Sequence, residues 1–371
     1  MQQRERQGAI RILAVAGARP NFMKIAPLLR EAAGRPHLRT HLVHTGQHYD
    51  AAMSTGFFEE LGIAEPDANL GVGSGSHAAM TAEVLRRIEP ILLEQRPDAL
   101  LVVGDVNSTL AATLAAVKLG VPVAHVEAGL RSFDRSMPEE VNRLLTDAVS
   151  HWLFVTEPSG RENLLREGVP AERIHLVGNV MIDTLLAHAA RARERDTLER
   201  FGLEPRGYAV LTLHRPSNVD DSARLRALFA VLEELHEELP VVFPIHPRTR
   251  AAIERDLGGR APRLQLTEPL GYLDFLRLMI DARLVLTDSG GIQEETTALG
   301  VPCLTLRENT ERPVTVTQGT NRIVGTDPAT IRTEVRKILE GGAQKSRVPD
   351  LWDGQAACRI VDVLERDLGS A

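Results

Sequence analysis

The sequence predicts an α/β fold with two doubly wound parallel sheets, one in each half of the chain. Short apolar runs such as "IRILAVAG" (10–17) and "LVLTD" (284–288) alternate with stretches of helical periodicity, as in buried parallel strands joined by helices. The order strand, Asp, small residues, helix, Gly-Val-Pro, strand begins at residue 101 and again at residue 284. The length of 371 residues is sufficient for two such domains.

Each predicted strand of the first half leads into a helix. The strand at 10–17 precedes an amphipathic stretch, "ALLVVGD" (99–105) precedes "STLAATLAAVKLG", and "VPVAHVE" precedes a charged loop and the helix 138–149. In the second half, strands are predicted at 208–214, 241–246, 264–267 and 284–288. We place the domain boundary near residue 180, and a charged helix at 187–202 opens the second half.

Composition excludes several classes of partner. The net charge is −7 and no basic run reaches five residues, so neither nucleic acid nor an anionic membrane is expected as a partner. No apolar stretch approaches the roughly 20 residues that cross a bilayer, and the N-terminal apolar run is better explained as a strand than as a signal peptide. Cys303 and Cys358 suggest neither a disulfide framework nor a metal cluster, and a cytoplasmic location is expected.

The stretch "TDSGGIQEETTALG" (287–300) is typical of a phosphate site. Ser289, Gly290 and Gly291 lead from a strand into a helix, where glycines allow close approach of a ligand and free N–H groups attract anions. Glu295, one turn into the helix, is placed to accept hydrogen bonds from ribose hydroxyls. The alternative is an ordinary glycine turn with acids in the first helical turn.

Cations follow other predicted strands. Arg19 and Lys24 flank the helix start after the first strand; they are either phosphate ligands or solvated surface cations. His214 and His246 follow two strands of the second half, in "HRP" and "HPR". A histidine in such a place is often structural, but two of them beside arginines favour a cationic patch.

Carboxylates follow the strands of the first half. Asp105 and Glu127 each end a strand, although an Asp in such a position can also be an N-cap. Glu139 falls in the first turn of the helix that starts at Pro138, and a simple alternative for it is an ion pair with Arg143 at i,i+4. The apolar stripe of this helix consists of Val141, Leu144, Leu145 and Ala148.

In this combination the chain resembles the non-hydrolysing UDP-N-acetylglucosamine 2-epimerases. The matching stretches are "GARPNFMKIAPL", "TGQHYD", "GDVNSTLA", "HVEAGLRS", "MPEEVNR", "GNVMIDTL", "LHRPSNVD", "LTDSGGIQEE" and "ERPVTVTQGTNRIVG". The resemblance implies the GT-B architecture, with two Rossmann-like domains that face a central cleft. The first domain is then 1–180, joined by a final helix 354–371, and 181–353 is the UDP-binding domain.

The resemblance also implies the reaction, which is the reversible inversion of C2 that gives UDP-N-acetylmannosamine. UDP is eliminated across C1–C2 to form 2-acetamidoglucal and then adds back, with protonation on the opposite face. The reaction needs proton donors and acceptors on both faces. No cofactor and no metal are implied; the UDP-sugar is the ligand, and a homodimer is expected.

Site residues follow from the matched motifs. The resemblance implies that Asp105, Glu127 and Glu139 are the catalytic acids and that His214 is the active-site histidine. The implied substrate-binding residues are Arg19, Lys24, Phe275 at the uracil pocket, Ser289, Gly290 and Gly291 at the phosphates, Glu295 at the ribose, and Arg312.

Some features leave alternatives open. Asn21 replaces a glutamate that many bacterial members carry in the first loop. A related branch acts on UDP-2,3-diacetamido glucuronic acids, so the substituents of the sugar stay undecided. A GT-B glycosyltransferase or UDP-sugar hydrolase would use similar nucleotide contacts. A catalytically silent nucleotide-sugar sensor is a further alternative, but it would not need Asp105, Glu127 and Glu139 together.

Overall fold

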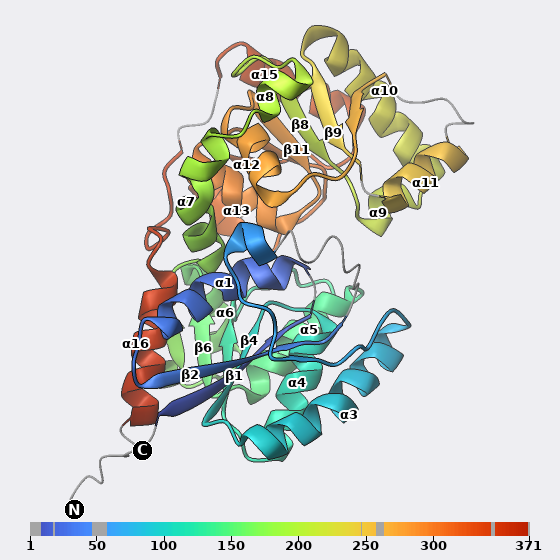
Figure 1. The fold of residues 1–371 in the computed structure, drawn as a ribbon. Coiled ribbons are helices and arrows are strands. Elements are labelled where there is room, and N and C mark those ends of the chain that lie inside the picture. Colours follow the sequence, from blue (N-terminus) through green and yellow to red (C-terminus); the bar gives the residue numbers. More distant parts are fainter. Residues whose placement is uncertain are drawn as a thin grey trace, which may run out of the picture. The chain divides into compact units, whose positions relative to one another are not determined.

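The computed structural model describes residues 9–17, 19–46, 58–245, 247–256, 263–342 and 346–369. The chain divides into two compact units (Figure 1). The first unit comprises Met1–Thr184 and Asp350–Ala371, and the second comprises Leu185–Pro349. Each unit is built on one sheet in which every pairing is parallel, so the predicted α/β fold with two parallel sheets is confirmed.

The first unit contains a seven-stranded sheet in the order β3-β2-β1-β4-β5-β6-β7. Its strands are β1 (Ile10–Ala16), β2 (Leu38–His44), β3 (Ala68–Asn69), β4 (Ala99–Val103), β5 (Val123–Val126), β6 (Trp152–Val155) and β7 (Ile174–Leu176). Its helices are α1 (Arg19–Ala33), α3 (His77–Gln95), α4 (Asn107–Lys118), α5 (Pro138–Val149), α6 (Pro158–Arg166), the 3₁₀ helix η1 (Ala171–Arg173) and α16 (Ala356–Gly369), while α7 (Val180–Arg193) runs from this unit into the next. The strand order reverses at β1, which is where doubly wound sheets bind ligands.

The second unit contains a six-stranded sheet in the order β10-β9-β8-β11-β12-β13. Its strands are β8 (Ala209–Thr212), β9 (Val241–Pro244), β10 (Gln265–Thr267), β11 (Leu284–Thr287), β12 (Cys303–Thr305) and β13 (Asn321–Ile323). Its helices are α8 (Thr197–Phe201), α9 (Pro216–Val219), α10 (Ser222–Glu238), α11 (Pro247–Asp256), α12 (Tyr272–Ile280), α13 (Gly290–Leu299), α14 (Pro313–Thr317) and α15 (Pro328–Leu339). The order again reverses, between β8 and β11.

Each sheet is buried by apolar side chains from neighbouring helices. In the first unit, Leu13 of β1 and Leu100 of β4 are fully buried in one cluster with Ile88 of α3 and Ala112 of α4. In the second unit, the corresponding cluster joins β8, β9 and β11 to α10 and α15. The sequences of these strands are continuous apolar runs because helices cover both faces of each sheet.

The last helix packs in the first unit, beside α1 (Figure 1). Arg35 forms ion pairs with Asp362 and Glu365 of α16. At the start of α16, the buried carboxylate of Asp183 accepts hydrogen bonds from the N–H groups of Ala356 and Ala357, at 3.2 and 2.7 Å. A residue of α7 therefore caps a helix that is far away in the sequence.

Two local features differ from the sequence-based predictions. The charged helix predicted at 187–202 is broken, because Arg195 and Thr197 both bind Asp274 of α12 and the chain turns between α7 and α8. The apolar stripe of α5 does not face the core: Val141 and Leu145 are 40% and 47% exposed. The helix instead buries its polar side, which comprises Glu140, Asn142, Arg143, Thr146 and Asp147.

Within the described ranges, no helix combines the length and the apolar composition that a membrane-spanning segment needs. Both cysteines are free thiols, and Cys303 is buried in β12.

The cap on α16 can be tested by mutation. Asp183→Ala removes the partner of two N–H groups, and we expect it to lower the free energy of unfolding by about 1–2 kcal/mol, the usual cost of losing an N-cap. The melting temperature should fall by about 2–4 °C for each kcal/mol lost in a domain of this size. Asp196→Ala is the control, because Asp196 stands before α8 without a side-chain cap hydrogen bond. Equal melting temperatures for the two variants would contradict the assignment.

Candidate active site

In the first unit, two turns with unusual backbone geometry follow neighbouring strands. Gly104 follows β4 with φ +68°, and Glu127 follows β5 with φ +72°. A left-handed conformation costs a residue such as glutamate roughly 1–2 kcal/mol, so the surrounding contacts have to hold it. Since β4 and β5 are parallel neighbours, both turns lie at the same edge of the sheet.

The Glu127 carboxylate is paired with the ammonium group of Lys24, which reaches it from α1. Both side chains are at most 10% exposed. A Cβ atom on Gly104 would lie 3.0 Å from Lys24 Nζ and 3.4 Å from Glu127 Oε2, so the absence of a side chain at Gly104 leaves room for this ion pair. Asn21 is buried beside it and donates to the carbonyl of Val103, at 3.0 Å.

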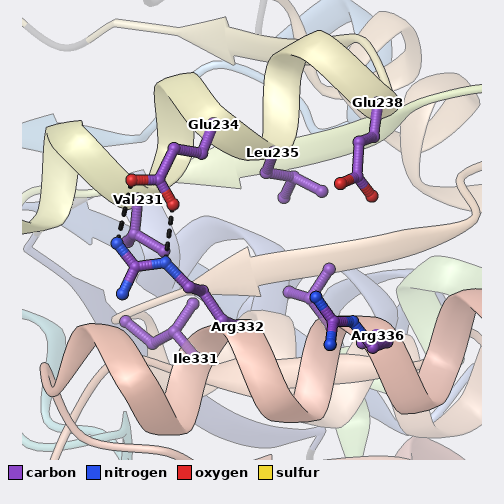
Figure 2. Close-up of a pocket in the computed structure, with 8 residues that line it drawn as sticks. Val231, Glu234, Leu235, Glu238, Ile331, Arg332 and Arg336 are labelled. Atoms are coloured by element: carbon purple, nitrogen blue, oxygen red, sulfur yellow. Dashed lines mark hydrogen bonds and ion pairs between the residues drawn. The ribbon is translucent and has the colours of Figure 1, made fainter.

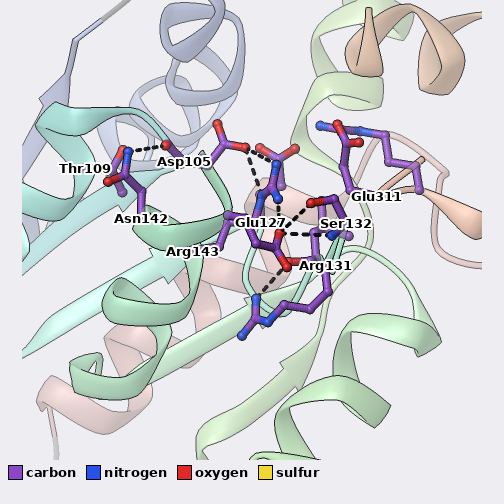
Figure 3. A network of polar contacts seen from close by, with 12 residues as sticks. Asp105, Thr109, Glu127, Arg131, Ser132, Asn142, Arg143 and Glu311 are labelled. Atoms are coloured by element: carbon purple, nitrogen blue, oxygen red, sulfur yellow. Dashed lines mark hydrogen bonds and ion pairs between the residues drawn. The ribbon is translucent and has the colours of Figure 1, made fainter. Parts of the chain in front are cut away.

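Asp105 does not cap α4, because the N-cap position is Val106 and carries no side-chain cap hydrogen bond. The N-cap alternative is therefore wrong. The Asp105 carboxylate instead binds the guanidinium of Arg143, with Nε and one terminal nitrogen at 3.0 and 2.9 Å from Oδ2 (Figure 3). Asp105 retains 25% side-chain exposure, while Arg143 is almost fully buried.

Glu139 and Glu140 have different surroundings. Arg143 pairs with Glu140 and Asp105, so the simple alternative for Glu139, an ion pair with Arg143, is wrong. Glu140 is buried and accepts hydrogen bonds from the N–H groups of Ser132 and Phe133, which fixes the charged loop. Glu139 is partly exposed, and among the described residues it has no ion-pair partner.

In the second unit, α13 begins at Gly290 directly after β11, with Ser289 as its N-cap residue. No side chain caps this N-terminus, so its first N–H groups are available to an anion. A Cβ atom on Gly290 would lie only 2.4 Å from the guanidinium of Arg312. A side chain at Gly290 would have to displace this guanidinium, because Arg312 packs directly against the start of the helix.

Arg312 lies between two buried carboxylates. Its Nε is 2.9 Å from Glu294, and one terminal nitrogen is 2.5 Å from Glu311. Glu311 also pairs with Arg307 at 2.8 Å, and Arg215 lies 3.7 Å from it. Arg215, Arg307 and Arg312 thus form one cluster with Glu294 and Glu311 close to the start of α13.

Glu295, the predicted ribose ligand, is 4% exposed and accepts a hydrogen bond from the Tyr272 hydroxyl at 3.3 Å. Burial raises the pKa of Glu295 to about 8, although the bond from Tyr272 opposes this and the charge of Glu294 adds to it. Phe275 is half-buried on α12, one turn after Tyr272.

His214 follows β8 and binds the buried carboxylate of Asp288 through Nδ1, at 2.9 Å. The backbone N–H groups of His214 and Arg215 also donate to Asp288. Burial alone would raise the pKa of Asp288, but the hydrogen bond and charge of His214, together with these N–H groups, hold it below its ordinary value. The His214 side chain is half exposed and available to a ligand.

The described structure thus groups the predicted residues by unit. Lys24, Asp105 and Glu127 meet at one sheet edge in the first unit, with Glu139 on the helix that carries Arg143. In the second unit, His214 and Arg312 lie around the strand end that leads to Ser289, Gly290 and Gly291. The side chains of Arg19 and the whole of His246 lie outside the described part.

Sequence reasoning missed the partners that hold these groups. They are Glu140, Arg143, Asp288, Glu294 and Glu311. Only Glu140 and Arg143 carried a signal, namely their spacing of three residues on one helix.

One surface pocket lies away from these residues, between α10 and α15 (Figure 2). Its volume is about 120 Å³, well below the roughly 300 Å³ of typical ligand pockets. Glu234 and Arg332 form a two-point ion pair across it, at 2.6 and 2.9 Å. It is a groove between two helices and does not fit a nucleotide sugar.

Comparison with known proteins identifies the family. A family model described as UDP-N-acetylglucosamine 2-epimerase matches residues 30–365. The chain belongs to the UDP-N-acetylglucosamine 2-epimerase family. It is 40% identical to the UDP-N-acetylglucosamine 2-epimerase of Methanocaldococcus jannaschii over 96% of this chain and 99% of that protein. It is also 43% identical to the UDP-2,3-diacetamido-2,3-dideoxy-D-glucuronate 2-epimerase of Pseudomonas aeruginosa, over 96% of this chain and 100% of that protein.

Solved structures of family members share the fold. The structure of the M. jannaschii enzyme in complex with UDP-GlcNAc and UDP gives a TM-score of 0.89, at 40% identity over 96% of this chain and 100% of that chain. The Neisseria meningitidis enzyme bound to UDP-GlcNAc gives 0.87, at 30% identity and with the same coverage. The predicted GT-B type of fold and the predicted family are both confirmed.

The pKa of Glu295 predicts a pH-dependent stability. Its ordinary value is 4.5 and its value in the folded protein is about 8. Between these pH values the unfolded chain loses this proton while the folded chain keeps it, so the contribution to stability is lost as pH rises from 4.5 to 8. Glu295→Gln cannot titrate. We therefore expect the melting temperature of the variant to rise relative to that of the unaltered protein as the pH increases from 5 to 8. Above pH 8 the difference between the two melting temperatures should stay constant. A difference that does not change with pH would contradict the burial of a protonated Glu295.

Proposed function

We propose that the protein catalyses the reversible epimerisation at C2 of a UDP-2-acetamido sugar, with UDP-N-acetylglucosamine and UDP-N-acetylmannosamine as the pair. The observation that carries the proposal is the placement of Asp105 and Glu127, each beside its own buried cation, at one edge of a Rossmann-like sheet. The supporting context is a chain that matches the epimerase family over most of its length.

The chemistry is an elimination followed by an addition. A carboxylate removes the proton from C2, the C1–O bond breaks, and UDP leaves with the bonding electron pair. The products are 2-acetamidoglucal and UDP. UDP then attacks C1 again while an acid on the other face of the ring protonates C2, so the configuration at C2 is inverted. The cycle consumes no oxidant and leaves the proton count unchanged.

Asp105, Glu127 and Glu139 are the proposed proton-transfer groups. Lys24 and Arg143 hold the carboxylates of Glu127 and Asp105 in place through ion pairs. Glu139 is partly exposed and has no ion-pair partner among the residues described, so its carboxyl group is proposed to reach the sugar directly.

UDP is proposed to bind to the second unit. Ser289, Gly290 and Gly291 are proposed to offer backbone N–H groups to the diphosphate, and the guanidinium of Arg312 lies beside Gly290. Glu295 is proposed to bind the ribose and Phe275 to line the uracil pocket. His214, held by Asp288, and Lys24 and Arg19 of the first unit complete the proposed set of ligand residues.

A second candidate substrate is UDP-2,3-diacetamido-2,3-dideoxy-D-glucuronate. The 43% identity to the P. aeruginosa enzyme favours it, while identities of 40–41% favour UDP-N-acetylglucosamine. Turnover of both purified nucleotide sugars, followed by proton NMR, separates the two. Turnover of the glucuronate alone would shift the proposal to that substrate, and turnover of neither would refute it.

We also propose a homodimer, because α5 exposes its apolar stripe. Val141 and Leu145 of this helix, and Leu85 and Leu93 of α3, are large apolar side chains on the surface of the first unit. Val141 and Leu145 are one turn apart on the same face of α5, and exposed apolar side chains side by side are typical of a surface that another protein covers.

The carboxylates give the main prediction. Asp105→Asn, Glu127→Gln and Glu139→Gln should each lower turnover by about 10²–10⁴-fold, the usual contribution of general acid–base catalysis. UDP affinity should change little, since UDP is proposed to bind to the other unit. Asp134→Asn, in the same charged loop, is the control and should keep full turnover. Normal turnover in all three variants would show that these residues are structural and not catalytic.

The dimer is tested by the mass in solution. Light scattering after gel filtration should give the mass of two chains for the unaltered protein. Leu145→Glu should shift it towards one chain. Leu165→Glu, at the exposed Leu165 of α6 rather than on α5, should leave the mass of two chains. An unshifted mass for Leu145→Glu would rule out this face.

A further inference from the structure

A buried histidine lies between the two turns that carry Asp105 and Glu127. His125 is on β5, is fully buried and cannot touch a ligand. Its Nε2 is 2.9 Å from the carbonyl oxygen of Gly104, and its Nδ1 is 2.6 Å from Oδ1 of Asp147 on α5.

Both partners of the ring accept hydrogen bonds. A carbonyl oxygen can only accept. Asp147 also accepts from the N–H of Gly129 at 3.0 Å and pairs with Arg131 at 2.7 Å. Burial alone would raise the pKa of Asp147, but His125 and Arg131 hold it below its ordinary value, so it is a carboxylate. Both ring nitrogens of His125 therefore face an acceptor, and a hydrogen bond to each acceptor needs an N–H on each nitrogen.

Asp147 links this ring to a chain of ion pairs. Arg131 pairs with Asp147 and also with Glu167, which it contacts at 2.8 and 2.7 Å. Gly104, which the ring contacts, also lies next to the Lys24–Glu127 ion pair, and this pair is neutral as a whole. A buried network that is fully paired in this way is rigid.

The hydrogen bond to Gly104 acts on the proposed proton-transfer groups. The N–H of Gly104 is fixed by the carbonyl of Val126 at 3.0 Å, and its carbonyl is fixed by His125. The next carbonyl, that of Asp105, accepts from Asn142 at 2.9 Å. The backbone on both sides of Asp105 is thus held at two successive carbonyl groups. The bond to the Gly104 carbonyl depends on an N–H at Nε2 of His125.

We propose that His125 is a positioning residue for the epimerisation: as an imidazolium between Asp147 and the Gly104 carbonyl, it sets the orientation of Asp105 and the space for the Lys24–Glu127 pair. The inference rests on the proposed roles of Asp105 and Glu127. It assigns a kinetic function to a side chain that never meets the substrate.

Two variants separate positioning from simple packing. His125→Gln keeps an N–H near the place of Nε2 and so keeps the bond to Gly104, whereas His125→Asn keeps an N–H near the place of Nδ1 and so keeps the bond to Asp147. Both leave a similar gap in the core. We expect His125→Asn to lower kcat about 10²-fold, the size of effect that a misplacement of about 1 Å can have, with unchanged KM and UDP affinity. His125→Gln should recover most of the turnover at a similar melting temperature.

A measurement on the unaltered protein covers the case in which neither variant folds. Among the twelve histidines, NMR of ¹⁵N-labelled histidine should show one ring with both nitrogens protonated at pH 8. A neutral ring at His125, identified by its protection from solvent and its coupling to Asp147, would overturn the proposal. Equal kcat for His125→Gln and His125→Asn would also overturn it. Full turnover of Asp105→Asn is a different result, because it refutes the proposed function itself.

Discussion

Charge at the ends of buried parallel strands has to be neutralised within each unit, and most of the site follows from this constraint. Lys24 pairs with Glu127, Arg143 with Asp105 and Glu140, His214 with Asp288, and Arg312 with Glu294 and Glu311. Removing one partner of a fully buried ion pair, such as Lys24–Glu127 or Arg312–Glu294, commonly costs about 3–5 kcal/mol. These pairs therefore fix the turns after β4, β5, β8 and β11 in one geometry, and the candidate site residues stand on those turns.

The same constraint explains the orientation of α5. The helix turns its polar side to the sheet because Asp105, His125 and the charged loop need Arg143, Asp147 and Glu140 as partners. Its apolar side, with Val141 and Leu145, is left at the surface. One helix thus links two proposals, since its buried face organises the proton-transfer groups and its exposed face is the proposed contact with a second copy.

The sequence predicted those parts that have a periodic or positional signal. The strands β1, β4, β5, β8, β9, β10 and β11 are apolar runs, and the candidate carboxylates and glycines follow them directly. Strands of two or three residues, such as β3, β7 and β13, are too short to give a period. The side of α5 that would be buried was not predictable, because periodicity finds two faces of a helix and does not say which one meets a charged sheet edge. Asp288 accepts a hydrogen bond from His214, and Asp147 accepts one from His125; these bonds span 74 and 22 residues, and no local pattern indicates them.

The origin of the hydrogen at C2 tests the central claim most directly. The protein is incubated with one unlabelled UDP-2-acetamido sugar in deuterated water, and the epimerised product is examined by proton NMR and mass spectrometry. Proton transfer by separate groups on the two faces of the ring predicts one deuterium at C2 of every product molecule formed. An epimerised product that retains the original hydrogen at C2 would contradict elimination and re-addition through these carboxylates.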